Sequence, residues 1–286
     1  MTIKGCRMCK VRFGLICIVS AMLVVWFVEG CAEDYKRAGQ AGLIKRYCWM
    51  ADLQEDEDLI EEYKEEMESE QWKMVCEIMK ERGVLDYDIY LFENRLLMIV
   101  ETELDFNIFE FGREISEMDE VRRWAGRMDR YFQTIEGYED SGWWVFLDRI
   151  YKLEQKKEYD KFGGYVVKRA SEPVRRICDA RELVDEAAQI AKYKRLHAMG
   201  KAWPEITQSM IDAGMIDLEI YSAGNRTFEI MEVPADADME KMWARIDNGP
   251  RSAEWGALMG PLDVRFVDEN GRPLDNQLME RVFKLN

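Results

Sequence analysis

The chain of 286 residues contains the same sequence pattern twice, and this repeat limits its possible folds more than any other feature. Residues 83–101 read GVLDYDIYLFENRLLMIVE, and residues 214–232 read GMIDLEIYSAGNRTFEIME. Eight of these nineteen positions are identical at a constant offset of 131, far more than chance would give. The chain is therefore expected to fold as two copies of one structural unit.

Matches on either side of this segment set the extent of each copy. Offsets of 130 to 132 pair further residues, among them Trp72 with Trp203 and Trp124 with Trp255. The copies span about 43–153 and 174–286. The linker 154–173 between them contains glycines and many charges, which is typical of an exposed connection.

Each copy shows the same order of expected elements. The order begins with an apolar segment and a long helix-like stretch that ends at a glycine. Two β-rich runs with a turn between them follow, and then a second helix and a last strand. In the first copy the segments are the strand 44–53, the helix 57–82, the turn 92–94, the helix around Trp124 and the closing strand 146–153. In the second they are 174–183, 187–213, 223–225, the helix around Trp255 and 279–285.

The order β-α-β-β-α-β is that of the ferredoxin-like unit, an α+β arrangement with helices on one face of a sheet. The other sheet face must be covered, and a second copy of the unit can cover it. We therefore expect two tandem ferredoxin-like units that form an intramolecular dimeric α/β barrel, a pseudo-dimer within one chain.

Composition excludes several classes of function. The formal charge of −16 argues against nucleic-acid binding, which needs a concentrated basic surface. The chain has a single histidine, which excludes metal sites with several histidines. If the protein performs acid–base chemistry near neutral pH, His197 is therefore the first candidate.

The first thirty residues are typical of an export signal. Four basic residues precede the apolar run 13–28, which is shorter than a membrane-spanning helix needs. The run ends Val28-Glu29-Gly30-Cys31, which resembles a bacterial lipobox apart from Glu29. We expect 1–30 to be a lipoprotein-type signal peptide and Cys31 to carry the lipid, so that an exported protein is held at a bacterial membrane only by this anchor, in the periplasm or at the cell surface. An uncleaved membrane anchor is the alternative.

Aromatic side chains gather around a break in the second copy. Tyr193 and His197 are four residues apart, so on a helix they lie on the same side. Gly200 interrupts that helix, and Pro204 is suited to start a new one, with Trp203 just before it. Three ring-bearing side chains at one irregularity can form a wall of a small polar pocket.

The stretch Tyr-x-x-x-His…Trp-Pro-Glu, followed by Asp-x-x-Ile-Tyr…Asn-Arg…Glu and Trp-x-x-x-Met, resembles the L-rhamnose mutarotase family. The resemblance covers 174–286 closely and 44–153 more loosely. It implies a dimeric α/β barrel that interconverts the anomers of L-rhamnose without a cofactor. It also implies that His197 is catalytic and that Tyr193 contacts the substrate. The family's pair of sugar-contacting tryptophans corresponds to Trp255 and Gly256, and another substrate-contacting tyrosine corresponds to Leu218. Only Trp255 is kept, so this chain departs from the family at two positions that bear on sugar preference.

The first copy departs where the chemistry is expected. Met67 stands at the position of His197, and Trp72 is followed by Lys73-Met74 where the second copy has Pro-Glu. Methionine cannot transfer protons, so we expect this degenerate copy to be catalytically inactive and to serve as a structural partner.

The leading hypothesis is a mutarotase acting on L-rhamnose or a related deoxy-sugar, with proton transfer by His197 and walls formed by Trp203 and Trp255. Tyr193 would orient the sugar or the imidazole. The alternative is a non-catalytic carbohydrate-binding lipoprotein on the same scaffold. A third hypothesis is a different enzyme of the same barrel architecture, because a fold does not fix a function.

Overall fold

The computed structural model describes residues 42–154, 164–169, 173–264 and 277–285. The expected signal peptide 1–30 and Cys31 lie outside these residues. Among the described helices, none is long and apolar enough to cross a membrane.

The first repeat contains β1 (Leu43–Leu53), α1 (Glu57–Glu66), α2 (Glu70–Glu81), β2 (Val84–Phe92), β3 (Arg95–Thr102), α3 (Ile108–Ser116), α4 (Asp119–Met128), β4 (Phe132–Gln133), β5 (Val145–Phe146) and β6 (Asp148–Lys152). The connection contains β7 (Tyr165–Lys168). The second repeat contains β8 (Val174–Leu183), α5 (Ala187–His197), α6 (Pro204–Asp212), β9 (Asp217–Ala223), β10 (Arg226–Pro234), α7 (Met239–Asp247), α8 (Ser252–Met259), β11 (Asp263–Val264) and β12 (Glu280–Lys284).

Local signals explain where the helices begin and end. The helix pair of each repeat ends at a glycine with positive φ, +95° at Gly83 and +96° at Gly214, a conformation that glycine adopts without a steric penalty. The single helix expected over 57–82 is in fact two helices. The chain breaks after α1 because Ser69 takes an extended conformation and its side chain caps α2 by accepting a hydrogen bond from the Trp72 backbone N–H.

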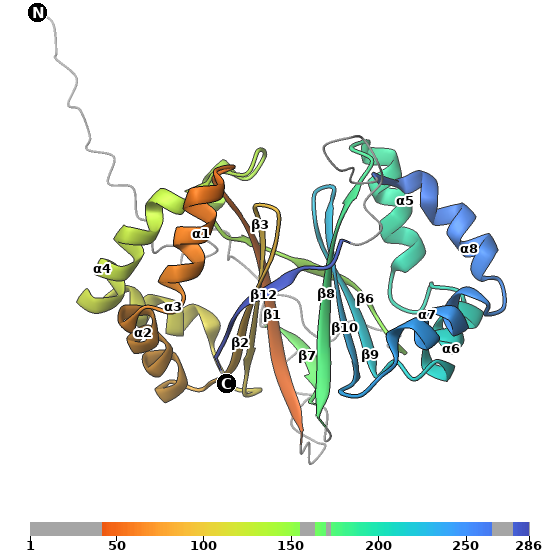
Figure 1. Ribbon diagram of the computed structural model, residues 1–286, viewed down its shortest axis with the longest axis horizontal. Coiled ribbons are helices and arrows are strands. Elements are labelled where there is room, and N and C mark those ends of the chain that lie inside the picture. The colour runs from red at the N-terminus through yellow and green to blue at the C-terminus, as the bar shows by residue number, and fades with distance from the viewer. Residues whose placement is uncertain (1–41, 155–163, 170–172, 265–276, 286) are drawn as a thin grey trace, which may run out of the picture.

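Two antiparallel sheets pack face to face, and the helices cover their outer faces (Figure 1). The main strand order is β12-β2-β3-β1-β4 in one sheet and β11-β8-β10-β9-β6 in the other. Buried side chains from both repeats, such as Met50, Leu97, Tyr221 and Phe228, fill the space between the sheets. The expected pair of ferredoxin-like units closed into an intramolecular α/β barrel is confirmed.

The last strand of each repeat corrects one expectation. We expected residues 146–153 and 279–285 to close their own units. Instead β6 pairs with β9 of the second repeat, and β12 pairs with β2 of the first (Figure 1). The alternating pattern identifies a strand but does not identify its partner, and the edge beside β2 or β9 is filled by the other repeat. Each sheet is therefore completed by its neighbour.

Part of the linker 154–173 is not the exposed connection that the sequence suggested. Residues Tyr165–Lys168 form β7, which pairs with the first half of β1. Tyr165 is buried, and its hydroxyl accepts a hydrogen bond from the Arg149 backbone N–H. The connection thus contributes to the barrel interior.

A network of buried ion pairs joins the two sheets. Arg46 of β1 contacts Glu101 of its own repeat at 2.5 Å and Glu232 of the other at 2.6 Å. The equivalent Arg176 of β8 contacts Glu101 at 2.5 Å and Glu232 at 3.1 Å. Burial alone would raise the pKa of Glu101, but the two guanidinium groups hold it at about 2. Glu101 and Glu232 thus each contact one arginine of the first repeat and one arginine of the second.

The repeated Asn-Arg pair of the β-turns also links the repeats. Arg95 contacts Glu182 at 2.6 Å, and its counterpart Arg226 contacts Asp52 at 2.6 Å. Asn94 donates a hydrogen bond to the Leu53 carbonyl oxygen at the end of β1. We expected this pair to shape the turn, and it also contributes two symmetric cross-repeat ion pairs.

Removal of one central arginine tests how strongly the fold depends on this network. Arg46→Met leaves Glu101, Glu219 and Glu232 buried with too few cations, so we expect the free energy of unfolding to fall by about 3–5 kcal/mol. Urea unfolding followed by circular dichroism measures the change. Arg122→Met, which removes an exposed pair on α4, is the control and should have little effect. Equal effects of the two substitutions would show that the network is not what holds the sheets together.

Candidate active site

His197 is the last residue of α5, at a break between two helices on the outer face of the second sheet. Gly200 has a φ of +70° within the break, and Pro204 is the first residue of α6. Trp203 precedes that proline as the N-cap residue. The helix break expected from Gly200 and Pro204 is present, and it places Trp203 close to the end of α5.

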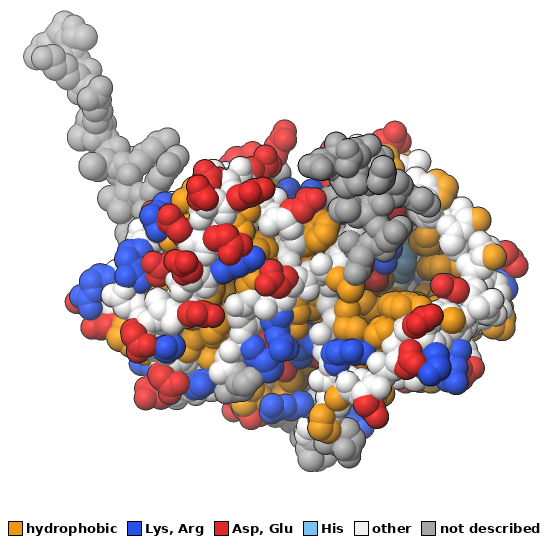
Figure 2. Space-filling view, viewed as in Figure 1, with side chains coloured by type: hydrophobic (Ala, Val, Ile, Leu, Met, Phe, Trp, Pro, Cys, Tyr) orange, Lys and Arg blue, Asp and Glu red, His pale blue; other side chains and the backbone are white. Residues whose placement is uncertain are grey.

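The four residues singled out from the sequence form one ring cluster. The ring centroids of Tyr193 and His197 are 4.1 Å apart, and those of His197 and Trp255 are 5.4 Å apart. Trp203 meets Trp255 edge-on at 5.2 Å. The side chain of the only histidine, pale blue in Figure 2, lies at the bottom of a hollow bordered by hydrophobic side chains. Helices α5, α6 and α8 thus bring all four residues together.

Arg251, which sequence reasoning missed, supports the outer wall of this cluster. Its guanidinium group lies 3.7 Å from the centre of the Trp203 ring, a cation–π contact. The same group contacts Glu205 at 3.5 Å and Glu254 at 3.2 Å. The backbone of Arg251 is left-handed, with a φ of +62°, at the start of α8. The turn before α8 therefore fixes the cation over the indole.

The exchanged strand β6 adds a residue of the first repeat to the site. The Tyr151 ring meets the His197 imidazole edge-on at 6.2 Å, and its hydroxyl lies 3.4 Å from the hydroxyl of Thr207. No sequence signal pointed to Tyr151, because its place depends on a strand pairing that the pattern does not specify. The site is therefore built from both repeats.

A polar cluster lies on the outer face of the second sheet, beneath the ring cluster. Arg181 contacts Asp179 at 3.0 Å, Glu229 at 3.2 Å and Asp263 at 3.8 Å. Burial and the charge of Glu229 raise the pKa of Asp179 to about 7, and burial raises the pKa of Asp263 to about 6. These carboxyl groups can therefore hold a proton near neutral pH. Among the described residues, no three Asp, Glu, His or Cys side chains are arranged to hold a metal ion.

These cluster residues were also missed by sequence reasoning. Alternation along β8 and β10 could have placed Asp179, Arg181 and Glu229 on one face, because residues two apart point to the same side. The same alternation is equally consistent with a face exposed to solvent, so the pattern alone does not show that these side chains are buried. The nearness of Asp263 requires the pairing of β11 with β8, which only the structure shows.

The hydrogen bond of His197 determines which ring nitrogen is free. Nδ1 lies 3.1 Å from the Tyr193 backbone oxygen, and a carbonyl oxygen only accepts. Nδ1 therefore carries the proton in the neutral ring, and Nε2 presents its lone pair. Burial lowers the pKa of His197 to about 4, although this hydrogen bond and Glu229 oppose the shift. The imidazole is thus a neutral base at physiological pH.

The two departures from the family pattern lie at different depths. Leu218 of β9 is buried in the core between the second sheet and its helices, together with Tyr193. Gly256 lies beside Trp255 on α8, and a side chain at this position would meet no atom within 4 Å of its Cβ. A smaller surface therefore replaces the second ring of the tryptophan pair.

Titration of the single histidine tests this description. We expect the His197 imidazole to titrate with a midpoint near pH 4, well below the ordinary 6.5, because the buried site disfavours the charged ring. The ring protons, followed by NMR, report the midpoint directly. Because the pKa is lower in the folded protein, this histidine also makes folding stability decline as the pH falls from about 6.5 towards 4. Trp255→Ala opens the site to water and should move the midpoint upward, whereas a wild-type midpoint at 6.5 would contradict a buried imidazole.

Comparison with known proteins agrees with the duplicated architecture. The sequence model of the L-rhamnose mutarotase family matches residues 46–153 and again residues 176–285. The L-fucose mutarotase of Xanthomonas campestris pv. campestris is 40% identical over 86 residues, which are 30% of this chain and 69% of that protein. A UPF0734 protein of Dictyostelium discoideum is 29% identical over 118 residues, 40% of this chain and 94% of that protein.

Among solved structures, a putative monooxygenase from Lactobacillus acidophilus NCFM aligns with a TM-score of 0.44 and 12% identity, over 84% of this chain and 95% of that one. The family match is the informative comparison, since it covers most of the chain and occurs once in each repeat. This chain belongs to the L-rhamnose mutarotase family, with two tandem copies of the family's unit in one polypeptide.

Proposed function

We propose that the second repeat interconverts the α and β anomers of a deoxy-sugar such as L-rhamnose or L-fucose, with His197 as the group that moves protons. The observation that carries this proposal is a neutral imidazole with a free Nε2 inside a cluster of aromatic rings. Membership of the mutarotase family and the relative named as an L-fucose mutarotase support the substrate class.

Mutarotation needs two proton transfers and no redox change. The anomeric hydroxyl loses a proton, the ring oxygen gains one, and the C1–O5 bond breaks to give the open aldehyde. Rotation about C1–C2 and the reverse transfers close the ring with the other configuration. Nε2 of His197 accepts the first proton as general base and returns it on closure. A protonated carboxyl group of the neighbouring cluster, Asp179 or Asp263, would donate the second proton to the ring oxygen and take it back on closure, because their raised pKa values allow them to hold a proton near neutral pH.

The other residues of the cluster would hold the sugar and orient the imidazole. Trp203 and Trp255 form apolar walls against which the C–H face of a sugar can stack, while Arg251 fixes Trp203 from outside. Tyr193 orients the imidazole twice, through its backbone oxygen and through the ring packed at 4.1 Å. A sugar stacked on these rings would bring its reacting oxygens near Nε2, with the charged cluster around Arg181 beneath it.

A carbohydrate-binding protein without catalysis is the second candidate. The low pKa of His197 favours it, because a general base works best when its pKa is near the operating pH. A binding protein needs only the hydrogen-bonding capacity of the neutral ring. The two functions differ in one measurable property, the rate at which bound anomers exchange.

Export and lipid attachment at Cys31 remain part of the proposal. The basic start, the apolar run 13–28 and the lipobox-like ending support it. We expect Cys31→Ser to move the protein from the membrane fraction to the soluble fraction of a bacterial host, while Cys48→Ser does not, because Cys48 is buried in the fold. Unchanged membrane association of Cys31→Ser would favour the uncleaved anchor.

Saturation-transfer NMR on the anomeric protons of L-rhamnose and L-fucose tests the activity. We expect exchange above the spontaneous rate, a loss of at least about 100-fold in His197→Ala, and a weaker affinity for sugar in Trp255→Ala. Trp243→Ala, an exposed tryptophan of the same repeat, is the matched control and should behave like the wild type. Sugar binding without exchange above buffer in the wild type would establish the binding module instead.

A further inference from the structure

The first repeat contains a cavity at the position that corresponds to the His197 site. The cavity has a volume of about 80 Å³ and lies between α2, α4 and the strands of the first sheet. Its lining includes Tyr63, Met67, Trp72 and Trp124. These are the counterparts of Tyr193, His197, Trp203 and Trp255 at the repeat offsets. The first repeat has therefore kept the aromatic frame of the site and lost its histidine.

The polar cluster beneath the second site is replaced in the first repeat by apolar side chains. Asp179 and Arg181 correspond to Trp49 and Ala51, and Glu229 and Asp263 correspond to Met98 and Phe132. All four replacements are buried members of one hydrophobic cluster, and Met98 and Phe132 line the cavity itself. A sugar would lose its hydrogen bonds to water here without finding replacements. The chemistry of the space has changed from polar to apolar.

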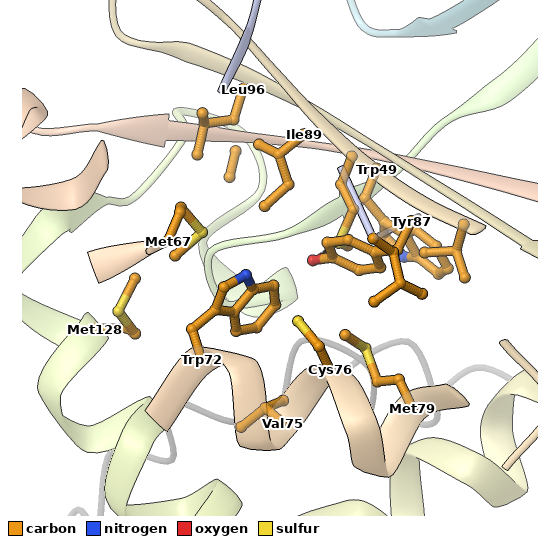
Figure 3. Packing of buried hydrophobic residues seen from close by; sticks show 14 of the residues in the cluster. Trp49, Met67, Trp72, Val75, Cys76, Met79, Tyr87, Ile89, Leu96 and Met128 are labelled. Atoms are coloured by element: carbon orange, nitrogen blue, oxygen red, sulfur yellow. Dashed lines mark hydrogen bonds between the residues drawn. The ribbon is translucent and has the colours of Figure 1, made fainter. Parts of the chain in front are cut away.

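Two hydrogen-bond donors in this apolar space lack a partner. The indole nitrogens of Trp72 and Trp124 are buried and contact no acceptor in the described part of the chain, and Trp72 is only 2% exposed. The two rings stack with their centroids 4.6 Å apart. Figure 3 shows Trp72 rising from α2 with its nitrogen directed toward the strands, into the space beside Met67 and Ile89. Buried donors are almost always paired, so an unpaired one indicates a missing acceptor.

The remaining walls can adapt to an occupant. Met67, Met79, Met98 and Met128 all line the cavity, and methionine is flexible and polarisable. An engineered cavity of about 150 Å³ holds benzene, which has six non-hydrogen atoms, so a space of about half that size holds about three at rest. A ligand of about six non-hydrogen atoms fits only when the methionine side chains move aside.

We propose that the first repeat binds a small, uncharged, largely apolar molecule with one acceptor oxygen, such as a cyclic ketone or ether, to which the indole N–H of Trp72 donates. This site differs from the sugar site in ligand class and does not depend on mutarotase activity. The degenerate repeat is then a second binding unit in addition to its structural role.

Cyclopentanone is the probe, and methylenecyclopentane is the matched control of similar shape without an oxygen. The full chain is labelled with ¹⁵N-tryptophan, and the indole N–H signals of Trp72 and Trp124 are assigned from the Trp72→Phe and Trp124→Phe spectra. We expect cyclopentanone to shift the Trp72 signal downfield in a saturable, one-site manner, as a new hydrogen bond would. Methylenecyclopentane should bind more weakly and cause no downfield shift. The absence of saturable binding would show that the cavity is only a packing void. Equal binding of both probes would show that the indole N–H of Trp72 does not recognise an acceptor oxygen, which would contradict the proposal.

Two substitutions separate recognition of the oxygen from filling of the space. Trp72→Phe keeps a ring but removes the donor, so the affinity for cyclopentanone should fall about fivefold while that for methylenecyclopentane is unchanged. Val75→Phe places a ring in the cavity and should abolish binding of both probes. Trp243→Phe, an exposed tryptophan of the second repeat, should leave both affinities unchanged. If Val75→Phe does not fold, the Trp72→Phe comparison decides alone, and equal losses for both probes there would overturn the proposal.

Discussion

The buried ring of Arg46, Arg176, Glu101 and Glu232 is the constraint on which the remaining structure depends. Taking four charges out of water costs several kcal/mol for each ion, and only close opposite charges offset that cost. Because each arginine contacts carboxylates of both repeats, neither half has a complete set of partners alone. The sheets must therefore meet in one register, and a shift by one residue would leave buried charges unpaired.

The exchanged strands follow from the same constraint. Once the sheets face each other, the open edge beside β2 is reached by β12 and the edge beside β9 by β6. Outer ion pairs continue along these edges, Lys152 with Asp217 and Lys284 with Asp86. Through β6, this exchange carries Tyr151 to the imidazole of His197. The candidate site thus depends on the interface between the repeats, although its main residues lie on the opposite face of the sheet.

Much of the fold could be predicted from the sequence, because a repeated order of local elements implies two equal structural units. The strands, the turns and the break at Gly200 and Pro204 are local, and two equal units imply a face-to-face pair. The partner of β6 could not be predicted, because alternation gives the face of a side chain and not its neighbour. Tyr151 and Asp263 were missed for this reason, since both reach the site through pairings between segments distant in the chain.

The two faces of each sheet have diverged to different degrees, and the ion network explains why. Inner positions are tied in pairs, so Arg46 and Arg176, or Glu101 and Glu232, cannot change one at a time without leaving a buried charge unpaired. Outer positions face helices of their own repeat, so their charges need partners within one repeat only. Glu229 and Arg181 in the second repeat can therefore correspond to Met98 and Ala51 in the first, because the pair changed within a single repeat. Duplication within one chain therefore permits what a symmetric dimer of identical units forbids, a polar outer face in one repeat and an apolar outer face in the other.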